Sequence, residues 1–369
     1  MTVTDQALLA DYTTLRLGGP ASRFVTAGSG GELIAAVRAA DAEGEPVLVL
    51  GGGSNLVVAD EGFPGVVVRV AGGGVQLAAD GDAMLLTAAA GESWDDFVQL
   101  SIDEGLAGIE CLSGIPGLVG ATPIQNVGAY GQEVSQSVVS VQAYDRLTDT
   151  EVGLAAAECG FGYRTSTFKR HATGGRGARL NAAGATGRHI VLGVTFRLAV
   201  SKLSVPVRYA ELARLLGVSE GDRVPLAEAR TAVLDLRRGK GMVLDPSDPD
   251  TRSAGSFFTN PVIPAARLAD LQAALAARGQ GGQVPYFAAA AGQVKVPAGW
   301  LIEQAGFGRG YPGTDTEGAR ISTKHTLALT SRGGSTADLI GLARRVRDGV
   351  LDAFGVRLEN EPVLVGTEL

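Results

Sequence analysis

Cysteine, histidine and long apolar runs are scarce in this sequence, and each shortage excludes a class of protein. The two cysteines, Cys111 and Cys159, are too few for a disulfide framework and stand in no CxxC spacing, so we expect two buried thiols. The three histidines are well separated and form no HExxH pattern, so we expect no metal site. No run of about 18 uncharged apolar residues occurs, so we expect no membrane-spanning segment.

Basic residues are outnumbered by acidic ones. The chain has 32 Lys and Arg against 39 Asp and Glu, which gives a net charge of −7. This balance argues against a protein that coats nucleic acid or an anionic membrane, although it leaves room for a small basic site. The first residues also lack a basic segment followed by an apolar one, so we expect a cytoplasmic protein.

Apolar periodicity predicts both helices and strands, and a length of 369 residues allows more than one core. Ser29 and Glu32 form a capping-box pattern before a helix over about 30–43, and Ser93 is predicted to cap a helix that ends at Gly105. Further strands are predicted over 46–50, 65–70, 84–90, 138–154 as a hairpin, 188–198 and 356–366, and further helices over 207–216, 226–238, 265–278, 298–305 and 337–354. The chain is therefore α+β, with a domain boundary near Gly72.

The segment VLVLGGGSNLVV, residues 47–58, sets three consecutive glycines between two apolar runs. It is no Rossmann fingerprint, because no third glycine opens a helix, and no Walker A loop, because no GK[ST] follows. Bare backbone N–H groups, with the Ser54 hydroxyl and the Asn55 amide, suit a diphosphate. A plain tight turn between two strands explains the glycines equally well.

A second loop, CLSGIPGLVGATPIQNVGAYG at residues 111–131, is too rich in Gly and Pro for regular structure and too apolar for a solvated linker. Its many backbone donors and acceptors suit the binding of a large planar cofactor and its phosphates. Structural packing around Pro116 and Pro123 is the alternative.

Several motifs of the chain occur in the order seen in one enzyme family. They are TTLRLGGPA, VLGGGSNLVV, GIECLSGIPGLVGATPIQNVGAYGQE, FGYRTSTFK, AGSFFTNP, PAGWLIEQAG and LENEPVLVG. In sequence and in order they resemble UDP-N-acetylenolpyruvoylglucosamine reductase, also called UDP-N-acetylmuramate dehydrogenase. The resemblance runs nearly end to end and implies an FAD oxidoreductase of peptidoglycan synthesis, a pathway tied to cell shape and division.

The resemblance also implies a fold and an organisation. The fold would be the FAD-binding fold of the vanillyl-alcohol-oxidase (PCMH) type, α+β, with two FAD-binding subdomains and a smaller α+β substrate-binding domain. The implied boundaries are 1–72, 73–243 and 244–355, with the C-terminal strand of 356–369 returning to the FAD-binding region. NADPH would reduce the FAD, and UDP-N-acetylglucosamine-enolpyruvate would then become UDP-N-acetylmuramic acid. We expect a monomer that binds these small molecules and neither nucleic acid nor membrane.

Three catalytic residues are implied by position in the motifs: Arg164, Ser256 and Glu361. Hydride addition to the enolpyruvyl double bond leaves negative charge beside the carboxylate, which an arginine can stabilise at two points. The hydroxyl of Ser256 would then protonate the same carbon without bringing charge into the site. Glu361 would hold the intermediate, either protonated or balanced by Arg164. Taken singly, each could instead be a surface ion-pair residue, a cap or a strand-edge charge.

The two loops would supply the cofactor site. The implied FAD-binding residues are Gly51, Gly52, Gly53, Ser54, Asn55, Leu56, Ser113, Gly114, Ile115, Pro116, Gly117, Gly120, Ala121, Gln125, Asn126, Gly128, Ala129, Tyr130 and Gly131.

Four further positions are implied in substrate binding: Tyr209, Lys240, Asn260 and His325. Tyr209 lies in an extended 203–241 segment that resembles the family subgroup whose tyrosine-bearing loop closes over the substrate and excludes water. The tyrosine could equally be the hydrophobic anchor of a helix start.

Two segments depart from the family pattern: 171–189 and 239–255 both look extended. The Gly- and Ala-rich part of the first, 173–187, reads as a flexible surface loop. Two other functions fit parts of the sequence: a flavin-dependent oxidase of a small alcohol or hydroxy acid with the same fold, or a nucleotide-sugar-binding protein that has lost turnover. The first needs no UDP site, and the intact catalytic trio speaks against the second.

Overall fold

The structure is a computed structural model that describes residues 2–173, 186–313 and 317–369. The chain divides into two compact units. Unit 1 comprises Met1–Leu8, Pro20–Gly53 and Gly62–Val243, and unit 2 comprises Leu9–Gly19, Ser54–Glu61 and Leu244–Leu369. The three-part division predicted from the sequence stays a prediction. The predicted flexible loop at 173–187 lies almost entirely outside the described residues.

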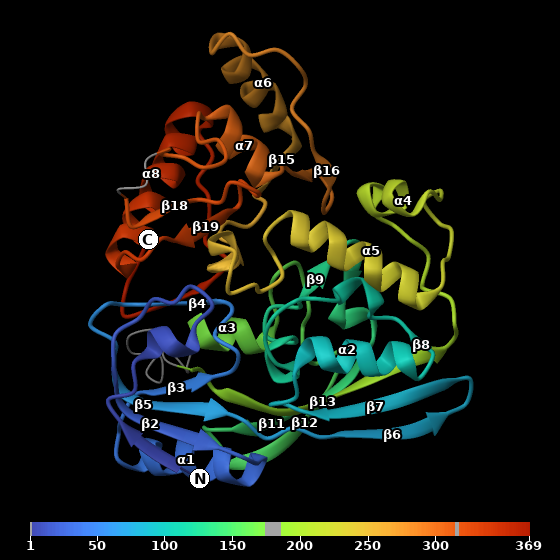
Figure 1. Ribbon diagram of the computed structural model, residues 1–369, viewed down its shortest axis with the longest axis vertical. Coiled ribbons are helices and arrows are strands. Elements are labelled where there is room, and N and C mark those ends of the chain that lie inside the picture. The colour runs from blue at the N-terminus through green and yellow to red at the C-terminus, as the bar shows by residue number, and fades with distance from the viewer. Residues whose placement is uncertain (1, 174–185, 314–316) are drawn as a thin grey trace. The chain divides into compact units, whose positions relative to one another are not determined.

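The first sheet of unit 1 has the strand order β1-β2-β5-β3 (Figure 1). Its strands are β1 (Thr2–Asp5), β2 (Ala21–Ala27), β3 (Val47–Leu50) and β5 (Phe63–Val70). β1 is antiparallel to β2, whereas β2, β5 and β3 run parallel. Parallel strands need a crossover connection, and α1 (Gly30–Ala42) connects β2 to β3, which lie on either side of β5. The predicted cap is present, because Ser29 Oγ accepts from the Glu32 N–H at 3.2 Å.

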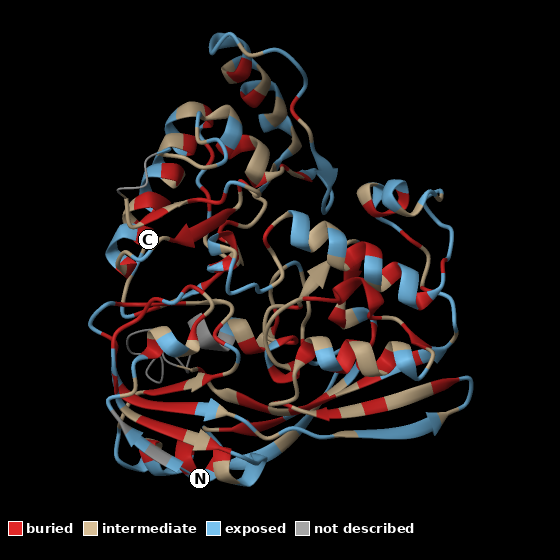
Figure 2. Cartoon of the chain, viewed as in Figure 1, coloured by how far each residue is buried: buried red, intermediate tan, exposed pale blue. Residues whose placement is uncertain are grey.

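The second sheet of unit 1 is antiparallel, with the order β12-β11-β13-β7-β6 and with β8 also paired to β13. Its strands are β6 (Val75–Asp80), β7 (Ala83–Ala89), β8 (Leu106–Ala107), β11 (Val138–Asp145), β12 (Thr150–Ala155) and β13 (His189–Val200). β13 is mostly buried, whereas the edge strand β6 is largely exposed (Figure 2). The predicted hairpin and the strands at 84–90 and 188–198 are confirmed.

Helix α2 (Trp94–Asp103) covers this sheet through an aromatic cluster. The ring of Phe196 in β13 lies 5.8 Å from that of Trp94 and 5.1 Å from that of Phe97, between centroids. Ser93 precedes the helix as predicted, but its side chain makes no capping hydrogen bond. Its backbone instead pairs with Leu118 of the second glycine loop, so the serine serves that contact.

Between α2 and β11 the chain is irregular but ordered, as the sequence predicts. It forms only short elements: η2 (Glu110–Leu112), η3 (Val119–Ala121), β9 (Gly128–Ala129), β10 (Gln132–Glu133) and η4 (Val134–Gln136). Buried polar contacts hold it, because the Glu110 carboxylate accepts from the N–H groups of Gly108 and Val205. Burial raises the pKa of Cys111 to about 12, so its thiol stays protonated. The expected buried thiols are confirmed for both cysteines.

The described part of unit 1 also contains the helices α3 (Thr167–Thr173), α4 (Ala210–Leu216) and α5 (Leu226–Gly239). α4 and α5 share a small core with the second glycine loop, formed by Cys111, Val207, Leu212 and Val233. Figure 1 shows α5 beside the segment that carries β9. This packing places the 203–241 segment against the loop that sequence analysis assigned to the cofactor.

Unit 2 contains three small sheets, with the orders β14-β19-β18, β15-β17-β16 and β20-β4. The strands are β4 (Leu56–Val58), β14 (Ser253–Ser256), β15 (Val262–Pro264), β16 (Phe287–Ala288), β17 (Gln293–Lys295), β18 (Ala319–Ile321), β19 (Ala328–Ser331) and β20 (Val363–Val365). Its helices are η1 (Leu9–Tyr12), η7 (Pro249–Thr251), η8 (Ala265–Arg267), α6 (Leu268–Ala277), α7 (Ala298–Gln304) and α8 (Thr336–Phe354). The core lies around α8, with Leu301, Leu339 and Val346 fully buried.

The glycine turn after β3 is not a tight turn between paired strands. β3 pairs with β5 in unit 1, whereas β4, directly after the turn, pairs in parallel with the C-terminal strand β20 in unit 2. The glycines therefore form a turn between two strands that do not pair with each other, and both its use for a diphosphate and its reading as a plain tight turn stay predictions.

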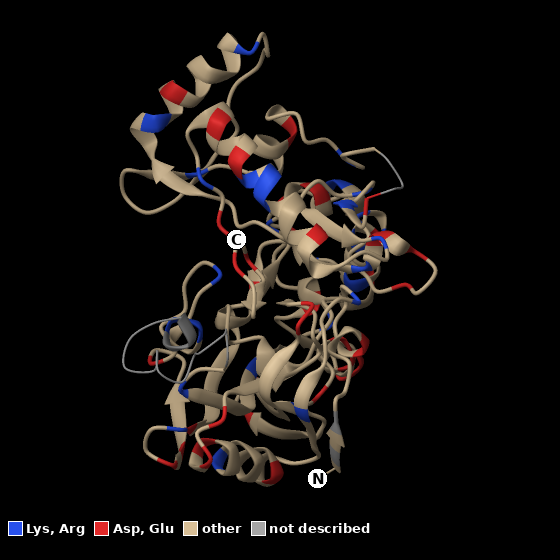
Figure 3. Ribbon diagram, turned by 90° about the vertical axis from the view of Figure 1, so that its left-hand side faces the viewer, with Lys and Arg blue, Asp and Glu red and all other residues tan. Residues whose placement is uncertain are grey.

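Basic and acidic residues alternate along the ribbon of both units in Figure 3, so neither sign dominates that view. Within the described part of the chain, no helix is long and apolar enough to cross a membrane.

Candidate active site

The two glycine loops meet in unit 1. A Cβ added to Gly52 would lie 2.7 Å from the Cα of Gly117, so only glycine allows the two backbones to come this close. Gly53 and Gly117 adopt φ values of 61° and 121°, which residues with a side chain rarely adopt. The sequence placed these loops more than 60 residues apart, and the fold joins them at one point.

A partly buried ion pair fixes the second loop to the helices beside it. Asp95 accepts two hydrogen bonds from Arg230, at 2.7 and 2.9 Å, and one from the Gly114 N–H at 2.5 Å. Burial by itself would raise the pKa of Asp95, but the hydrogen bonds from Arg230 and Gly114 outweigh it and lower that pKa. The carboxylate therefore stays ionised and holds both partners.

Three of the six described non-glycine residues with a left-handed backbone are predicted site residues. Asn126, Tyr130 and Arg164 have φ values of 48°, 49° and 52°, in the left-handed region that non-glycine residues usually avoid. The Asn126 side chain donates to the Glu133 carboxylate at 2.8 Å and accepts from the Ser135 N–H at 3.1 Å. Such conformations persist only where surrounding contacts enforce them, and they cluster at functional sites.

Arg164 lies against the second loop. Its Nη2 donates to the carbonyl of Gly128 at 2.8 Å, and its guanidinium lies 5.6 Å from the centroid of the Tyr163 ring. The carbonyl of Gly128 thereby holds one N–H of the guanidinium in place. The predicted catalytic arginine is thus beside two predicted cofactor residues, Gly128 and Ala129, in β9.

Arg237 is a candidate that sequence analysis missed. The residue is partly buried with a fully buried Nε, and desolvation lowers the pKa of its guanidinium while the attraction of Tyr130 partly opposes that change. Its Nη2 donates to the Met242 carbonyl at 2.8 Å, and in the described part of the chain its Nε has no hydrogen-bond partner. Helical spacing could have revealed it, because Arg237 follows the buried Ala229 and Val233 at four-residue intervals.

The surroundings of Arg237 fit an anionic cofactor. A Cβ added to Gly114 would lie 3.3 Å from Arg237 Nε, so the bare backbone of the second loop borders the guanidinium. A buried cation with an unfilled N–H is costly unless a ligand or water completes it. The residues present therefore suit FAD, whose diphosphate and ring carbonyls are hydrogen-bond acceptors.

Tyr209 and Lys240 are brought together with Tyr130. The rings of Tyr130 and Tyr209 meet edge to face, with centroids 5.4 Å apart. Lys240 Nζ lies 5.6 Å from the centroid of Tyr130 and forms an ion pair with Glu211 at 2.6 Å. Burial raises the pKa of Tyr130 to about 12, so its hydroxyl stays protonated and can donate a hydrogen bond.

In unit 2 the structure brings Ser256 and Glu361 onto adjacent backbones. Ser256 ends β14, and the Glu361 N–H donates to the carbonyl of the next residue, Phe257, at 2.9 Å. Phe258 and Asn360 form a β-bridge one step further along. The two predicted catalytic residues are therefore neighbours in space, although 105 positions separate 256 from 361.

Asn260 and His325 have clear local partners in unit 2. Asn260 Oδ1 accepts from the Ala298 N–H at 2.9 Å, at the start of α7. His325 Nδ1 accepts from the Leu327 N–H at 3.1 Å, which places the proton of a neutral imidazole on Nε2. His325 can therefore donate through Nε2.

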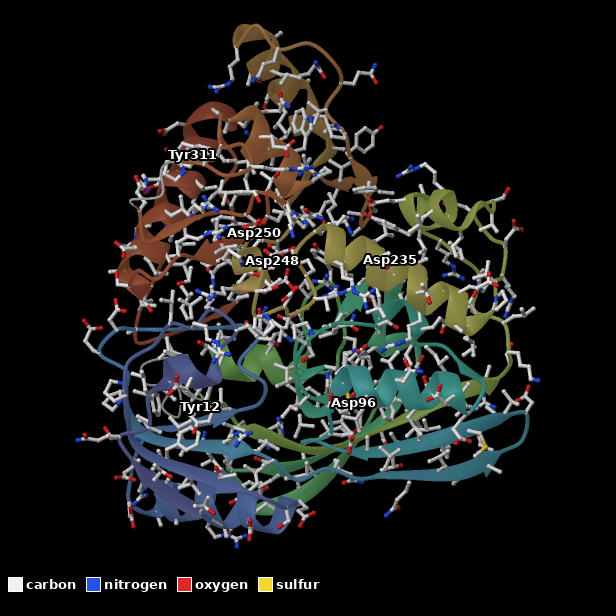
Figure 4. The ribbon with its side chains drawn as sticks, viewed as in Figure 1. Tyr12, Asp96, Asp235, Asp248, Asp250 and Tyr311 are labelled. Atoms are coloured by element: carbon white, nitrogen blue, oxygen red, sulfur yellow. The ribbon has the colours of Figure 1, made fainter. Side chains whose placement is uncertain are left out.

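The long segment before Ser256 is ordered by two acidic residues, Asp248 and Asp250, which lie together at η7 (Figure 4). Asp248 binds Lys324 at 2.6 Å. Asp250 is buried, pairs with Arg332 and accepts from the Thr323 hydroxyl. These contacts anchor the chain just before β14 and so position Ser256.

Ser54, Asn55 and Leu56 fall in unit 2 rather than with the preceding glycines. The Asn55 carbonyl accepts from the Val363 N–H at 2.9 Å, two residues beyond Glu361. This portion of the first glycine loop is thereby tied to the segment that carries the predicted catalytic glutamate.

Comparison with known proteins decides the family. A model described as FAD binding domain matches residues 21–152, and one described as UDP-N-acetylenolpyruvoylglucosamine reductase, C-terminal domain, matches residues 246–365. The UDP-N-acetylenolpyruvoylglucosamine reductase of Thermobifida fusca is 57% identical over 364 residues, which cover 98% of this chain and 97% of that protein. The chain belongs to the UDP-N-acetylenolpyruvoylglucosamine reductase family.

Further members of the reductase family agree. The reductase of Saccharopolyspora erythraea is 54% identical, with 99% of this chain and 96% of that protein covered. The crystal structure of the UDP-N-acetylenolpyruvylglucosamine reductase from Thermus caldophilus matches with a TM-score of 0.60 and 25% identity over 99% of each chain. The predicted family, the α+β fold of the vanillyl-alcohol-oxidase type, the FAD cofactor and the oxidoreductase class are confirmed.

Proposed function

We propose that this protein reduces UDP-N-acetylglucosamine-enolpyruvate to UDP-N-acetylmuramic acid in peptidoglycan precursor synthesis, with NADPH as the hydride donor. The observation that carries the proposal is the 57% identity with a UDP-N-acetylenolpyruvoylglucosamine reductase over nearly the full length of both chains. The meeting of the two glycine loops at Gly52 and Gly117, with Arg164 bonded to Gly128, supports it.

The glycine loops would hold FAD, and Arg237, which lies next to Gly114, would supply an additional cation. When bound, FAD accepts a hydride from NADPH and delivers one to the enolpyruvyl group. The backbone N–H groups of residues 51–55 would hold the diphosphate, because close approach of a bare backbone suits an anion. The ion pair of Asp95 with Arg230 would keep Gly114 and its neighbours in place for that contact.

Arg164 would stabilise the negative charge that develops beside the substrate carboxylate. Its hydrogen bond to Gly128 and its enforced left-handed backbone hold the guanidinium in advance, so little reorganisation is needed during the reaction. Its planar fork can bind the carboxylate at two points.

Ser256 would protonate the carbon next to the carboxylate, and Glu361 would help to hold the intermediate. Support comes from the backbone contact between Phe257 and Glu361, which fixes the two side chains to one small region of unit 2. His325, with a donor at Nε2, would bind an oxygen of the substrate.

The UDP part would be bound by Tyr209, Lys240 and Asn260. An aromatic ring, an ammonium and an amide suit a base, a diphosphate and a sugar hydroxyl respectively. Both substrates react at the same flavin, so we expect them to compete and to give ping-pong kinetics. A cytoplasmic location, a monomeric state and the lack of binding to nucleic acid or membrane remain predictions.

The test is an anaerobic visible-absorbance trace of the FAD-loaded protein, with NADPH added first and UDP-N-acetylglucosamine-enolpyruvate second. Bleaching followed by recovery establishes both half-reactions. Bleaching without recovery keeps the flavoenzyme and overturns the substrate, and recovery that requires oxygen instead points to an oxidase of the same fold. Absence of a flavin band after loading with FAD would refute the cofactor site.

A further inference from the structure

An ion pair joins the proposed diphosphate-binding lysine to α4. Lys240 lies at the C-terminal end of α5, and its Nζ is 2.6 Å from Glu211 Oε2 in the first turn of α4. Both side chains are partly exposed, at 28% and 34%. A ligand in solution can therefore reach this pair without unfolding the core.

The same ammonium also contacts an aromatic pair that ends on α4. Lys240 Nζ lies 5.6 Å from the centroid of Tyr130, whose ring packs edge to face on Tyr209. Tyr209 is the residue that directly precedes α4. The lysine, Glu211 and Tyr209 are thus parts of one contact between α4, α5 and the second glycine loop.

We propose that Glu211 is an intramolecular competitor that occupies Lys240 in the ligand-free protein and must release it before a nucleoside diphosphate binds. The inference rests on the proposed function, which assigns Lys240 to the diphosphate. A carboxylate and a phosphate compete for the same ammonium protons, and two anions at one site repel each other.

The charge of the ligand decides whether it can displace Glu211 from Lys240. A diphosphate carries more negative charge than one carboxylate, so it displaces Glu211, whereas a neutral nucleoside gains nothing from Lys240. Glu211 thereby weakens the binding of a diphosphate by the cost of its own displacement and leaves the binding of a neutral nucleoside unchanged. Release of Glu211 also removes one of the contacts that hold α4.

The test measures binding of UDP and of uridine to the full-length, FAD-loaded protein by calorimetry. Glu211→Gln keeps the size of the side chain and removes its charge. We expect the Kd for UDP to fall by about twofold to fivefold, the effect of a partly exposed ion pair, and the Kd for uridine to stay the same. High salt should shrink the difference in Kd for UDP between wild type and variant, because salt screens the charges of Glu211 and of the diphosphate.

Glu228→Gln is the matched control. Glu228 is exposed in the first turn of α5, 12 positions from Lys240 by numbering, and its substitution changes the net charge equally. We expect its Kd for UDP to equal that of the wild type. A gain as large as that of Glu211→Gln would mean that total charge explains the effect, and it would overturn the proposal.

Lys240→Met separates the inference from the function on which it rests. We expect this variant to bind UDP at least about tenfold more weakly, and the gain from Glu211→Gln to vanish in the double variant. If Lys240→Met weakens binding while Glu211→Gln leaves it unchanged or weaker, the competition by Glu211 is refuted and the lysine assignment stands. If Lys240→Met has no effect on UDP binding, the assignment of Lys240 to the diphosphate and the competition by Glu211 are both refuted. The absorbance trace then tests the proposed function by itself.

Hydrogen exchange gives a readout besides affinity. In the ligand-free protein, amides of residues 207–217 should exchange faster in Glu211→Gln than in wild type, because one contact of α4 is gone. With saturating UDP the two proteins should exchange alike. Equal exchange without ligand would show that Glu211 does not hold α4 and would contradict the proposal.

Discussion

Unit 1 and unit 2 contribute different kinds of group to the proposed reaction. Unit 1 contains the glycine pair Gly52 and Gly117 and the cation Arg164, which suit the binding of anions. Unit 2 contains the hydroxyl of Ser256 and the carboxyl of Glu361, which suit the handling of a proton. The proposed roles of Arg164 and of Ser256 therefore rest on separate local structures, so we expect each role to be removable without the other.

Loss of the unit 2 hydroxyl should have the largest effect. In Ser256→Ala, NADPH should still bleach the flavin at the wild-type rate, while recovery with the enolpyruvyl substrate slows by about 10²–10⁴-fold, the usual size of a general acid contribution. Stopped-flow absorbance separates the two phases. Ser247→Ala, an exposed serine of the same unit, is the control and should leave both phases unchanged. Normal recovery in Ser256→Ala would remove the proton-donor role.

Replacement of Arg164, the cation in unit 1, should have the second-largest effect on the reaction. Arg164→Lys should slow recovery by about 10²–10³-fold, because a lysine cannot reproduce a two-point contact with developing negative charge. Flavin bleaching by NADPH should change little. Arg170→Lys, at an exposed arginine six positions further on, serves as the control. A defect in flavin bleaching alone would contradict the proposed division of roles between the two units, since Arg164 would then act on NADPH and not on the enolpyruvyl substrate.

The contact between the glycine loops can be tested by Gly52→Ala. The added Cβ would lie 2.7 Å from Gly117 Cα, so the two backbones must separate. We expect the Kd for FAD to rise by about tenfold, which corresponds to roughly 1.4 kcal/mol, as measured by flavin fluorescence during titration. Gly31→Ala in α1 is the matched control, because a Cβ there meets no atom within 4 Å. Equal FAD affinity in both variants would mean that loop contact does not matter for the cofactor.

The ion pair beside Gly114 should give the smallest effect, on stability. Asp95→Asn leaves the mostly buried Arg230 without its charge partner, so we expect a loss of about 1–2 kcal/mol in the free energy of unfolding. Denaturant titration measures it, and Asp96→Asn at the exposed neighbour (Figure 4) should lose much less. Equal losses would indicate a general charge effect.

The acid dependence of the same pair has a definite sign. The folded pKa of Asp95 is lowered, so its stabilising contribution is present above the unfolded value of about 3.9 and is lost as pH falls through the folded pKa. The stability gap between wild type and Asp95→Asn should therefore narrow below about pH 4. A gap that stays constant there would show that the carboxylate charge is not what stabilises the loop.

Much of the secondary structure followed from local pattern. Helix α1 begins at the predicted cap Ser29, although Glu32 accepts from the Gly28 N–H and does not close the capping box, and the alternating segment at 138–154 forms the predicted hairpin of β11 and β12. The second glycine loop is irregular and ordered, as its Gly and Pro content indicated. These features depend on residues that are close in sequence, which is why periodicity and turn chemistry suffice to predict them.

Contacts between residues that are far apart in sequence could not be predicted from local sequence patterns. Nothing in the run around Asp95 points to Arg230, and nothing around Lys240 points to Glu211, because charged residues on helices usually face solvent without a fixed partner. Arg237 lies at helical spacing from the buried Ala229 and Val233. This pattern is easily overlooked because other charged residues near it in α5 are exposed.

The sequence by itself determined the family, the α+β composition, the two bare loops and the residue types that the chemistry needs, because motifs and periodicity are written along the chain. Only the tertiary structure decided that Gly52 would lie against Gly117, that β4 would pair with β20 rather than with β3, and that Lys240 would be held by an acidic side chain. Those outcomes depend on which surfaces pack together, and packing is a property of the whole chain rather than of any segment in it.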